Sequence, residues 1–440
     1  MKLCSTNDPS LRAQWRDAVL KGLAPGGGLY IPTELPHLTT ADLEATRNLP
    51  FSELAMTLAK LFLQGEVPDP VIEQICSESF TFDVPLKKIE GATYILELFH
   101  GPTCAFKDFG ARFMARLFRY FLDSKGENLT VLVATSGDTG SAVANAFFDP
   151  SPNAPIKVAI LFPRGKVSLV QERQMTTLGH NVTAFEVEGT FDDCQHLVKR
   201  ALADVELQAS NRLTSANSIN IARLLPQMFY YVHAALQISD PKPPVFSVPS
   251  GNLGNLTGGL MAHLMGLPVT RFIAACNRND VFPNYLSSEI FTPRASIETV
   301  SNAMDVGNPS NFARILPLYG TSLEKIRADI CGYGFSDEET IAAIASWYER
   351  TGYILDPHTA VGALALEKLR ATRSTHYAPG IVLATAHPAK FGDVVKRAIG
   401  VEPEIPPQLR DALEQPGHKV ALQNCYDSLK RHLSDPKEAR

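Results

Sequence analysis

The sequence predicts an α/β protein with mainly parallel sheets, because one local pattern occurs three times. In residues 129–147, 245–267 and 381–399, an apolar run typical of a buried strand is followed by a polar turn and then by a helical segment. Ligands of open parallel sheets bind beyond the carboxyl ends of the strands. Since the polar turns follow the strands directly, we expect them to lie where a ligand binds.

The composition indicates a globular protein that buries a large core. The chain has 440 residues, of which 45% are hydrophobic and 20% charged, and this length is sufficient for two or three domains. The formal net charge is −5 with scattered Lys and Arg, which favours a small-molecule substrate over nucleic acid or a membrane surface. No apolar leader follows Lys2 and no uncharged stretch approaches the length of a membrane span, so we expect a cytoplasmic protein.

The residues outside the repeated pattern narrow the class of protein further. The first hundred residues lack the pattern and are predicted to be mostly helical from about 39 to 80. The seven cysteines lie far apart and form no C-x-x-C pair, which is typical of a reducing compartment and predicts no metal site. No H-E-x-x-H or G-x-S-x-G motif occurs, so a hydrolytic nucleophile has little support.

Lys107 stands between a Gly-Pro turn and an apolar helical run in the segment "GPTCAFKDFGARF", residues 101–113. One interpretation is a solvated lysine whose stem lies on the apolar face. The other is a half-buried amine that loses its proton easily, as a Schiff-base lysine requires. The partial positive charge of a helix N-terminus would lower the proton affinity of that amine further.

Two glycine-containing turns are candidate anion sites. The turn "SGNLGN", residues 250–255, places successive amides at a helix start, where a phosphate binds; the alternative is a tight turn that holds nothing. The turn "TSGDTG", residues 135–140, offers hydroxyls and amides to a small carboxylate or phosphate. Thr135, Asp138 or Thr139 can equally cap the following helix, and the two roles are compatible.

A third polar segment, "SANSINIAR" at residues 215–223, precedes an apolar helix. Its Asn217, Ser218 and Arg223 are suited to a second phosphate, although an N-capped helix with an exposed arginine is the alternative. In "ATAHPAKF", Thr385 leaves its strand with a hydroxyl, and His387 receives no role. Two anion sites and a lysine of low basicity together indicate a phosphorylated aldehyde cofactor and a second anionic ligand.

Seven motifs in this order resemble those of the threonine synthases. They are "LFHGPTCAFKDFG", "ATSGDTGSAVA", "PRGKVSLVQERQM", "SANSINIAR", "VPSGNLGNLTGG", "SNAMDVGNPSN" and "TAHPAKF". The resemblance extends from about residue 1 to 400 and is to the longer branch, with a "GGLYIP"-like segment at 27–32. It implies fold type II of the pyridoxal-phosphate enzymes, the fold of the tryptophan synthase β subunit: two open, mainly parallel sheets flanked by helices, with the cofactor between the domains.

The resemblance also implies a division of the chain. Residues 1–95 would form a mostly helical N-terminal region that packs on the large domain, and 96–205 a smaller, mobile α/β domain with the SGDTG turn. Residues 206–400 would form the large cofactor-binding α/β domain, and 401–440 a C-terminal helical tail. The protein would be a monomer or a homodimer.

Roles for individual residues follow from the same resemblance. Lys107 would form the Schiff base with pyridoxal 5'-phosphate, and Thr385 would face the pyridine nitrogen with a neutral hydroxyl. The cofactor phosphate would be held by Gly251, Asn252, Leu253, Gly254 and Asn255, in which Leu253 and Asn255 stand where Phe and Asp are frequent. The substrate carboxylate would be received by Thr135, Ser136, Gly137, Asp138 and Thr139. The substrate phosphate would be bound by Asn217, Ser218 and Arg223.

The implied reaction converts O-phospho-L-homoserine and water to L-threonine and phosphate by γ-elimination and β-addition of water. Lys107 would move several protons, and domain closure would exclude stray water. A phospho-lyase or dehydratase of the same fold, which releases 2-oxobutyrate, is the nearest alternative because the two paths diverge only at water addition. A non-catalytic cofactor-binding protein is a third, against which the intact Lys107 argues.

Overall fold

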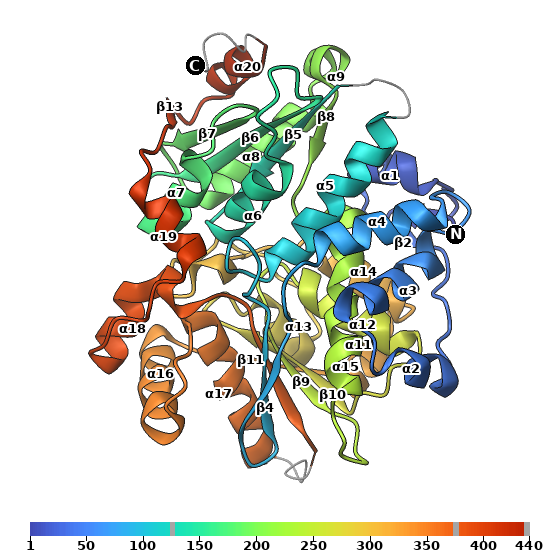
Figure 1. Ribbon diagram of the computed structural model, residues 1–440, viewed down its shortest axis with the longest axis vertical. Coiled ribbons are helices and arrows are strands. Elements are labelled where there is room, and N and C mark those ends of the chain that lie inside the picture. The colour runs from blue at the N-terminus through green and yellow to red at the C-terminus, as the bar shows by residue number, and fades with distance from the viewer. Residues whose placement is uncertain (124–127, 373–377, 435–440) are drawn as a thin grey trace.

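Two open sheets with helices on their faces form the protein in a computed structural model that describes residues 1–123, 128–372 and 378–434 (Figure 1). The larger sheet has the strand order β11-β10-β9-β12-β4-β3, and the smaller has the order β13-β7-β6-β5-β8. Every strand pair in these two sheets is parallel except β3 with β4, for the described residues. The predicted α/β fold with mainly parallel sheets is therefore confirmed.

The central strands β9 and β12 of the larger sheet are buried along their whole length and mainly apolar, as expected for a parallel sheet that is covered on both faces. Its strands are β3 (Leu86–Glu90), β4 (Thr93–Glu97), β9 (Val245–Pro249), β10 (Arg271–Cys276), β11 (Ile330–Gly334) and β12 (Gly380–Ala384). The helices of this part are α12 (Gly254–Leu264), α13 (Val281–Ser288), α14 (Phe312–Leu318), α15 (Leu323–Asp329), α16 (Asp337–Thr351), α17 (Pro357–Thr372) and α18 (Gly392–Ile399).

The smaller sheet is built in the same way. Its strands are β5 (Leu129–Ala134), β6 (Ile156–Pro163), β7 (Val182–Val187), β8 (Leu213–Ser215) and β13 (Val420–Leu422). The helices around it are α6 (Asp138–Phe147), α7 (Leu169–Thr176), α8 (Phe191–Ala203) and α9 (Val205–Asn211). The three predicted strand–turn–helix segments are thus β5–α6, β9–α12 and β12–α18, as the sequence indicated.

The N-terminal region is helical where the sequence predicts helices. After the antiparallel pair β1 (Leu3–Ser5) and β2 (Tyr30–Pro32), with α1 (Trp15–Lys21) between them, come α2 (Thr40–Thr46), α3 (Phe51–Leu63) and α4 (Asp69–Ser79). In α3, Leu54, Leu58 and Phe62 recur at helical spacing and are buried, which packs α3 on α4 and α11. This blue segment lies beside α5 in Figure 1.

The C-terminal residues contain more than helices. Helices α19 (Pro407–Glu414) and α20 (Tyr426–Ser434) flank the three-residue strand β13, which pairs with β7 in parallel. Helix α20 packs on α8 and α9, and α19 packs on α7, so the red end of the chain lies against the smaller sheet (Figure 1). The region predicted as a helical tail therefore adds an edge strand to that sheet.

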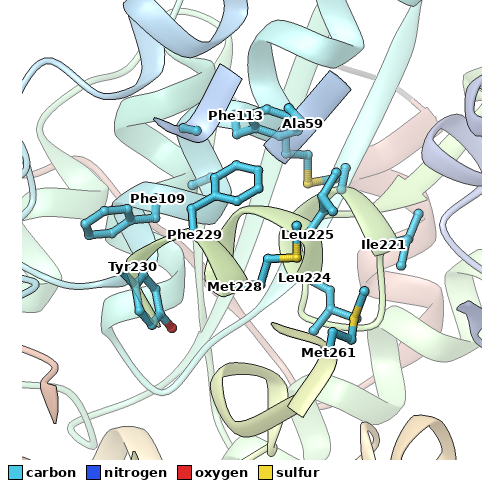
Figure 2. Close-up of a cluster of buried hydrophobic side chains, with 14 of the residues drawn as sticks. Ala59, Phe109, Phe113, Ile221, Leu224, Leu225, Met228, Phe229, Tyr230 and Met261 are labelled. Carbon is cyan, nitrogen blue, oxygen red and sulfur yellow. The ribbon is translucent and has the colours of Figure 1, made fainter. Parts of the chain in front are cut away.

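Helix α5 (Lys107–Asp123) is anchored in the largest cluster of buried apolar side chains. Figure 2 shows its Phe109 and Phe113 beside Phe229 and Tyr230, which belong to α11 (Phe229–Leu236). The short helices α10 (Ile221–Leu224) and η2 (Leu225–Met228) supply the neighbouring Leu and Met side chains. The rings of Phe109 and Tyr230 meet edge to face with centroids 5.3 Å apart. This packing fixes the helix and, with it, the position of its first residue, Lys107.

None of the helices in the described ranges combines the length and the apolar character that crossing a membrane requires.

Candidate active site

The polar turns predicted from the sequence meet around one cavity between the two sheets. It is lined by the start of α5, the β5–α6 turn, the loop after β8, the β9–α12 turn and the end of β12. All the predicted site residues line it except Gly137 and Leu253. The structure therefore brings together residues from Lys107 to Thr385, which are far apart in the sequence.

Lys107 lies in this cavity with only 13% of its side chain exposed. Its Nζ is 3.9 Å from Oδ2 of Asp138 and 4.9 Å from the centre of the Phe106 ring. Burial lowers the pKa of the amine to about 8; Asp138 opposes this shift, and Lys390 and Arg223 add to it. The interpretation of Lys107 as a solvated surface lysine therefore does not hold.

Asp138 is a buried carboxylate with three partners. Oδ1 lies 2.9 Å from Nζ of Lys390 and accepts a hydrogen bond from Nε2 of Gln171 at 3.0 Å, while Oδ2 faces Lys107. Desolvation alone would raise the pKa of this carboxyl group, but the charges of Lys390 and Lys107 outweigh it and hold the pKa well below the usual range. Asp138 therefore carries a negative charge inside the cavity.

The rest of the TSGDTG turn is organised by Thr135. Its hydroxyl oxygen accepts hydrogen bonds from the amides of Gly137 and Gly140, both at 2.9 Å. Gly137 adopts a φ of 133°, and a Cβ there would lie 2.3 Å from the side chain of Gln171, so only glycine fits. Ser136 and Thr139 line the cavity and offer hydroxyls to a ligand.

The SGNLGN turn forms a cradle at the start of α12. A Cβ on Gly251 would lie 2.8 Å from Cα of Met304, so the loop approaches the 302–304 backbone as only glycine allows. Leu253 has a left-handed backbone, with φ 58°, and its side chain is buried in the core rather than in the cavity. Nδ2 of Asn255 donates to the carbonyl of Pro249 at 2.7 Å, which closes the turn.

The segment after β8 is tied to both neighbouring turns. Nδ2 of Asn217 donates to the carbonyl of Ala134 at 2.7 Å, and Oδ1 of Asn217 accepts from the amide of Ala134. Oγ of Ser218 accepts from Nδ2 of Asn252 at 2.8 Å and from Nδ2 of Asn311 at 3.1 Å. These bonds hold the three turns in one fixed arrangement.

Arg223 is buried, which excludes the exposed arginine of the alternative interpretation. Its Nη1 donates to the carbonyl of Ala216 at 2.7 Å, and its Nε has no hydrogen-bond partner among the described residues. Gly110 of α5 makes room for it, since a Cβ on Gly110 would lie 2.8 Å from that Nε. Arg223 also lines the cavity, and a buried cation there suits an anionic ligand group.

The end of β12 is joined directly to the residues before Lys107. The amide of Phe106 donates to the carbonyl of Thr385 at 2.8 Å, and the Thr385 side chain lines the cavity. Nδ1 of His387 accepts from the amide of Ala389 and caps the short helix η5 (Pro388–Phe391). His387, which received no role from the sequence, is thus a capping residue outside the cavity lining.

Sequence reasoning missed four residues that shape the site: Lys390, Gln171, His358 and Arg314. His358 lines the cavity, with its Nδ1 2.8 Å from Asp356 and its Nε2 accepting from the amide of Ala303. Arg314 is fully buried and donates to the carbonyls of Tyr30, Ser218 and Ile219, which joins β2 to the site. Lys390 and Arg314 each stand in a mainly apolar segment, which is the signal that singled out Lys107.

Comparison with known proteins agrees with this geometry. The family described as "Pyridoxal-phosphate dependent enzyme" matches residues 83–387, "Threonine synthase N terminus" matches 2–80, and "Threonine synthase, C-terminal" matches 359–433. The threonine synthase of Escherichia coli is 40% identical over 418 residues, which cover 94% of this chain and 95% of that protein. This chain belongs to the threonine synthase family.

Other threonine synthases match over nearly the whole length. That of Haemophilus influenzae is 40% identical, covering 98% of this chain and 99% of its own. The crystal structure of the Escherichia coli threonine synthase superposes with a TM-score of 0.91 at 39% identity, covering 98% of this chain and 99% of that one. A PLP-bound threonine synthase from Brucella melitensis gives 0.91 at 38% identity, covering 99% of both chains. The threonine synthase family thus confirms the predicted fold type II.

Proposed function

We propose that this chain converts O-phospho-L-homoserine and water to L-threonine and phosphate, with pyridoxal 5'-phosphate held by Lys107. The observation that carries the proposal is the cavity itself, which joins a buried lysine of low basicity, a glycine cradle at a helix start and a buried arginine with an unused donor. Membership of the threonine synthase family supports the same activity.

The residues fit the cofactor. The cradle from Gly251 to Asn255 would hold its phosphate, because the loop amides and the N-terminus of the eleven-residue helix α12 favour an anion. Thr385 would face the pyridine nitrogen with a hydroxyl, which does not force that nitrogen to stay protonated. When bound, pyridoxal phosphate supplies an electron sink that makes protons on neighbouring carbon atoms of an attached amino acid acidic.

Lys107 would move protons between the substrate carbons during the reaction. An amine with a pKa of about 8 takes up and releases protons near neutral pH, as a general acid and base must. The hydroxyls of Ser136 and Thr139, which line the cavity, would receive the substrate carboxylate, while Thr135 and Gly137 hold the turn in shape through the bond between the Gly137 amide and the Thr135 hydroxyl. Each of the two oxygens of Asp138 faces a lysine. Asp138 would therefore balance the charges of Lys107 and Lys390 and would not bind the carboxylate.

Arg223, Asn217 and Ser218 would bind the substrate phosphate. Arg223 lines the cavity, and its planar guanidinium group would donate to phosphate oxygens. Asn217 and Ser218 hold the loop between the cradle and the β5 end. Arg223, Asn217 and Ser218 would also retain the phosphate after it leaves the substrate, close to the carbon atom to which water is added.

The site must exclude stray water while the substrate carbons are reactive. Asp192 at the start of α8 accepts two hydrogen bonds from Ser296, whose segment leads into Met304 at the cavity. We propose that the two sheets move against each other at this contact between Asp192 and Ser296, which would open and close the cavity.

The predicted division at 1–95, 96–205, 206–400 and 401–440 stays a prediction, as do the cytoplasmic location and the state of a monomer or homodimer.

Product analysis tests the proposal. Cofactor-loaded protein is incubated with O-phospho-L-homoserine, and phosphate, threonine and 2-oxobutyrate are measured together. Threonine equal to phosphate is the expected result. Phosphate matched by 2-oxobutyrate would make the protein a lyase of the same fold, and absence of phosphate release from fully loaded protein would refute the substrate. Lys107→Ala is the control variant, since it should lose both the visible absorption of the bound cofactor and the activity.

A further inference from the structure

A second buried lysine lies beside Lys107 and shares its carboxylate partner. The side chain of Lys390 is 0% exposed, and its Nζ lies 2.9 Å from Oδ1 of Asp138. The other oxygen of Asp138 lies 3.9 Å from Nζ of Lys107. The two lysines therefore flank one carboxylate, with one lysine at each oxygen.

The fold fixes Lys390 relative to Lys107. Nζ of Lys390 donates to the carbonyl of Thr103 at 2.8 Å, four residues before Lys107. The amide of His387 donates to the carbonyl of Cys104 at 3.0 Å, and Ala386 forms an isolated bridge with Ala105. The segment that carries Lys390 is thus bound along its length to the segment that leads into Lys107.

Charge balance decides what such an arrangement does. A buried carboxylate with a single lysine partner stabilises the proton on that lysine, because the attraction is strong where water is excluded. With Lys390 on its other oxygen, Asp138 already has a counter-charge when Lys107 is neutral. Lys390 also repels a proton on Lys107 directly, and both effects act in the same direction.

The other charged and titratable groups around the pair do not replace Lys390. They are Arg223, Asp356, His358, Asp108, Cys104 and His387. Oδ1 of Asp356 lies 2.8 Å from Nδ1 of His358, and Oδ1 of Asp108 accepts a hydrogen bond from the hydroxyl of Thr103 at 2.7 Å. Cys104 stays a neutral thiol because burial raises its pKa to about 12. Among the described residues, Lys390 is the cation in direct contact with the far oxygen of Asp138.

We propose that Lys390 is a positioning residue that supplies the counter-charge of Asp138, so that Lys107 can lose its proton and react with the cofactor aldehyde. This inference rests on the proposed role of Lys107. In that step the neutral amine adds to the aldehyde carbon, a carbon–nitrogen double bond forms, and the aldehyde oxygen leaves as water. The rate depends on the neutral fraction of Lys107, and Lys390 sets that fraction through Asp138.

The test measures cofactor uptake by the full-length protein after its cofactor has been removed. Saturating pyridoxal phosphate is added between pH 6 and 9, and the rate at which the visible absorption band appears is recorded. In Lys390→Met, the midpoint of the pH profile should move upward by about one unit, so that uptake at pH 7 is roughly tenfold slower. In Asp138→Asn, the midpoint should move downward. The carboxylate no longer stabilises the proton on Lys107, while the positive charge of Lys390 still repels that proton. A purely structural role would not produce shifts of opposite sign.

Three further variants separate the possible outcomes. Lys390→Arg keeps the charge and should restore a midpoint close to that of the unmodified protein. Lys396→Met removes an exposed lysine paired with Glu402 at 2.7 Å and should leave the profile unchanged. Lys107→Ala should form no band at all; if it does form one, the proposed role of Lys107 fails rather than that of Lys390.

An unchanged midpoint in Lys390→Met, with uptake still dependent on Lys107, would overturn the inference and leave the proposed function standing. If Lys390→Met does not fold, Asp138→Asn decides: no shift, or an upward shift, refutes the counter-charge role.

Discussion

Arg223 is the residue in the cavity whose role can be assigned most directly by one substitution. It is buried with an unused Nε, and its nearest carbonyl partner, Ala216, accepts from Nη1 only. Arg223→Lys keeps the charge but loses the planar donor pair that a phosphate accepts. We expect KM for O-phospho-L-homoserine to rise about tenfold, which is a loss of about 1.4 kcal/mol of binding, with a smaller effect on kcat.

Cofactor uptake measured on Arg223→Lys provides the check on this assignment. If Arg223 binds the substrate phosphate, the affinity for pyridoxal phosphate should not change. A lower cofactor affinity with an unchanged KM would mean instead that Arg223 holds the cofactor phosphate. Arg410→Lys, at an exposed position of α19, is the matched control and should change neither quantity.

The buried side chain of His387 makes the free energy of unfolding depend on pH. Burial lowers its pKa from 6.5 to about 4, and its Nδ1 accepts from an amide, which requires the neutral ring. As pH falls below 6.5, the unfolded chain binds a proton at His387 before the folded protein does, so unfolding is favoured. The contribution of His387 to stability is therefore present above pH 6.5 and is lost as pH falls towards 4.

His387→Asn removes the titration but keeps a side-chain acceptor for the cap. Between pH 7 and 4.5 the unmodified protein should lose about 2 kcal/mol more of its unfolding free energy than this variant does. Urea unfolding at the two pH values measures the difference. His37→Gln, at an exposed position, should retain the full pH dependence; equal slopes in all three proteins would contradict the prediction.

The lysines show how far single residues could be interpreted from the sequence. Lys107 stood out as a cation in an apolar helical run, and its side chain is largely buried, as the second interpretation of this segment expected. Whether it was buried or solvated depended on segments far away in the chain, such as α10 and η2, which lie more than one hundred residues later and pack on α5. Lys390 has the same local signal, but its partner Asp138 lies about 250 residues earlier, and no local pattern predicts that pairing.

At the scale of elements, the cradle at the start of α12 is the feature most sensitive to a small change. A methyl group on Gly251 would meet the backbone of Met304 at 2.8 Å, and a backbone atom cannot move aside as the end of a side chain can. Gly251→Ala should therefore displace the loop and raise the Kd for pyridoxal phosphate at least about tenfold. Equilibrium titration followed by the visible absorption band measures this change.

Gly392→Ala is the matched control for that substitution. Gly392 begins α18 with an ordinary helical backbone, and a Cβ there would meet nothing within 4 Å. The variant should bind the cofactor as the unmodified protein does and should unfold at the same or a slightly higher denaturant concentration. Equal affinities for Gly251→Ala and Gly392→Ala would show that the cradle does not hold the cofactor.

The elements themselves were predictable where their patterns were long. The β5–α6, β9–α12 and β12–α18 segments each combine a buried strand with a helix of at least eight residues, and the sequence indicated all three. Strand β13 has three residues, Val420–Leu422, and leaves no recognisable period. It forms because β7 offers an unpaired edge, which is a property of the assembled sheet and not of the segment.

At the scale of the whole molecule, exposed polar contacts join the smaller-sheet part of the protein to the loop that precedes Met304, close to the cavity. Oδ2 of Asp192 accepts from the amide and the hydroxyl of Ser296, at 3.1 and 3.0 Å, and Nζ of Lys166 lies 2.6 Å from Glu298. Asp192 is the second residue of α8 and follows Phe191, which lines the cavity. The contacts are solvent-exposed, so each contributes little free energy and can break and form during turnover.

Asp192→Ala should favour the state in which the two sheets are apart and the cavity is open. It does not change the residues that would hold the cofactor. Exposed contacts of this kind contribute about 0.2–1 kcal/mol, so KM for O-phospho-L-homoserine should rise a few-fold while cofactor affinity stays the same. Because an open site would let the unsaturated amino acid leave before water is added to it, the share of phosphate release that ends as 2-oxobutyrate should rise as well. Glu188→Ala, which removes an exposed ion pair with Arg164 within the smaller sheet, is the control and should change neither quantity. An unchanged KM and product ratio in Asp192→Ala would mean that the sheets need not close at this contact for catalysis, and the proposed movement would have to be rejected.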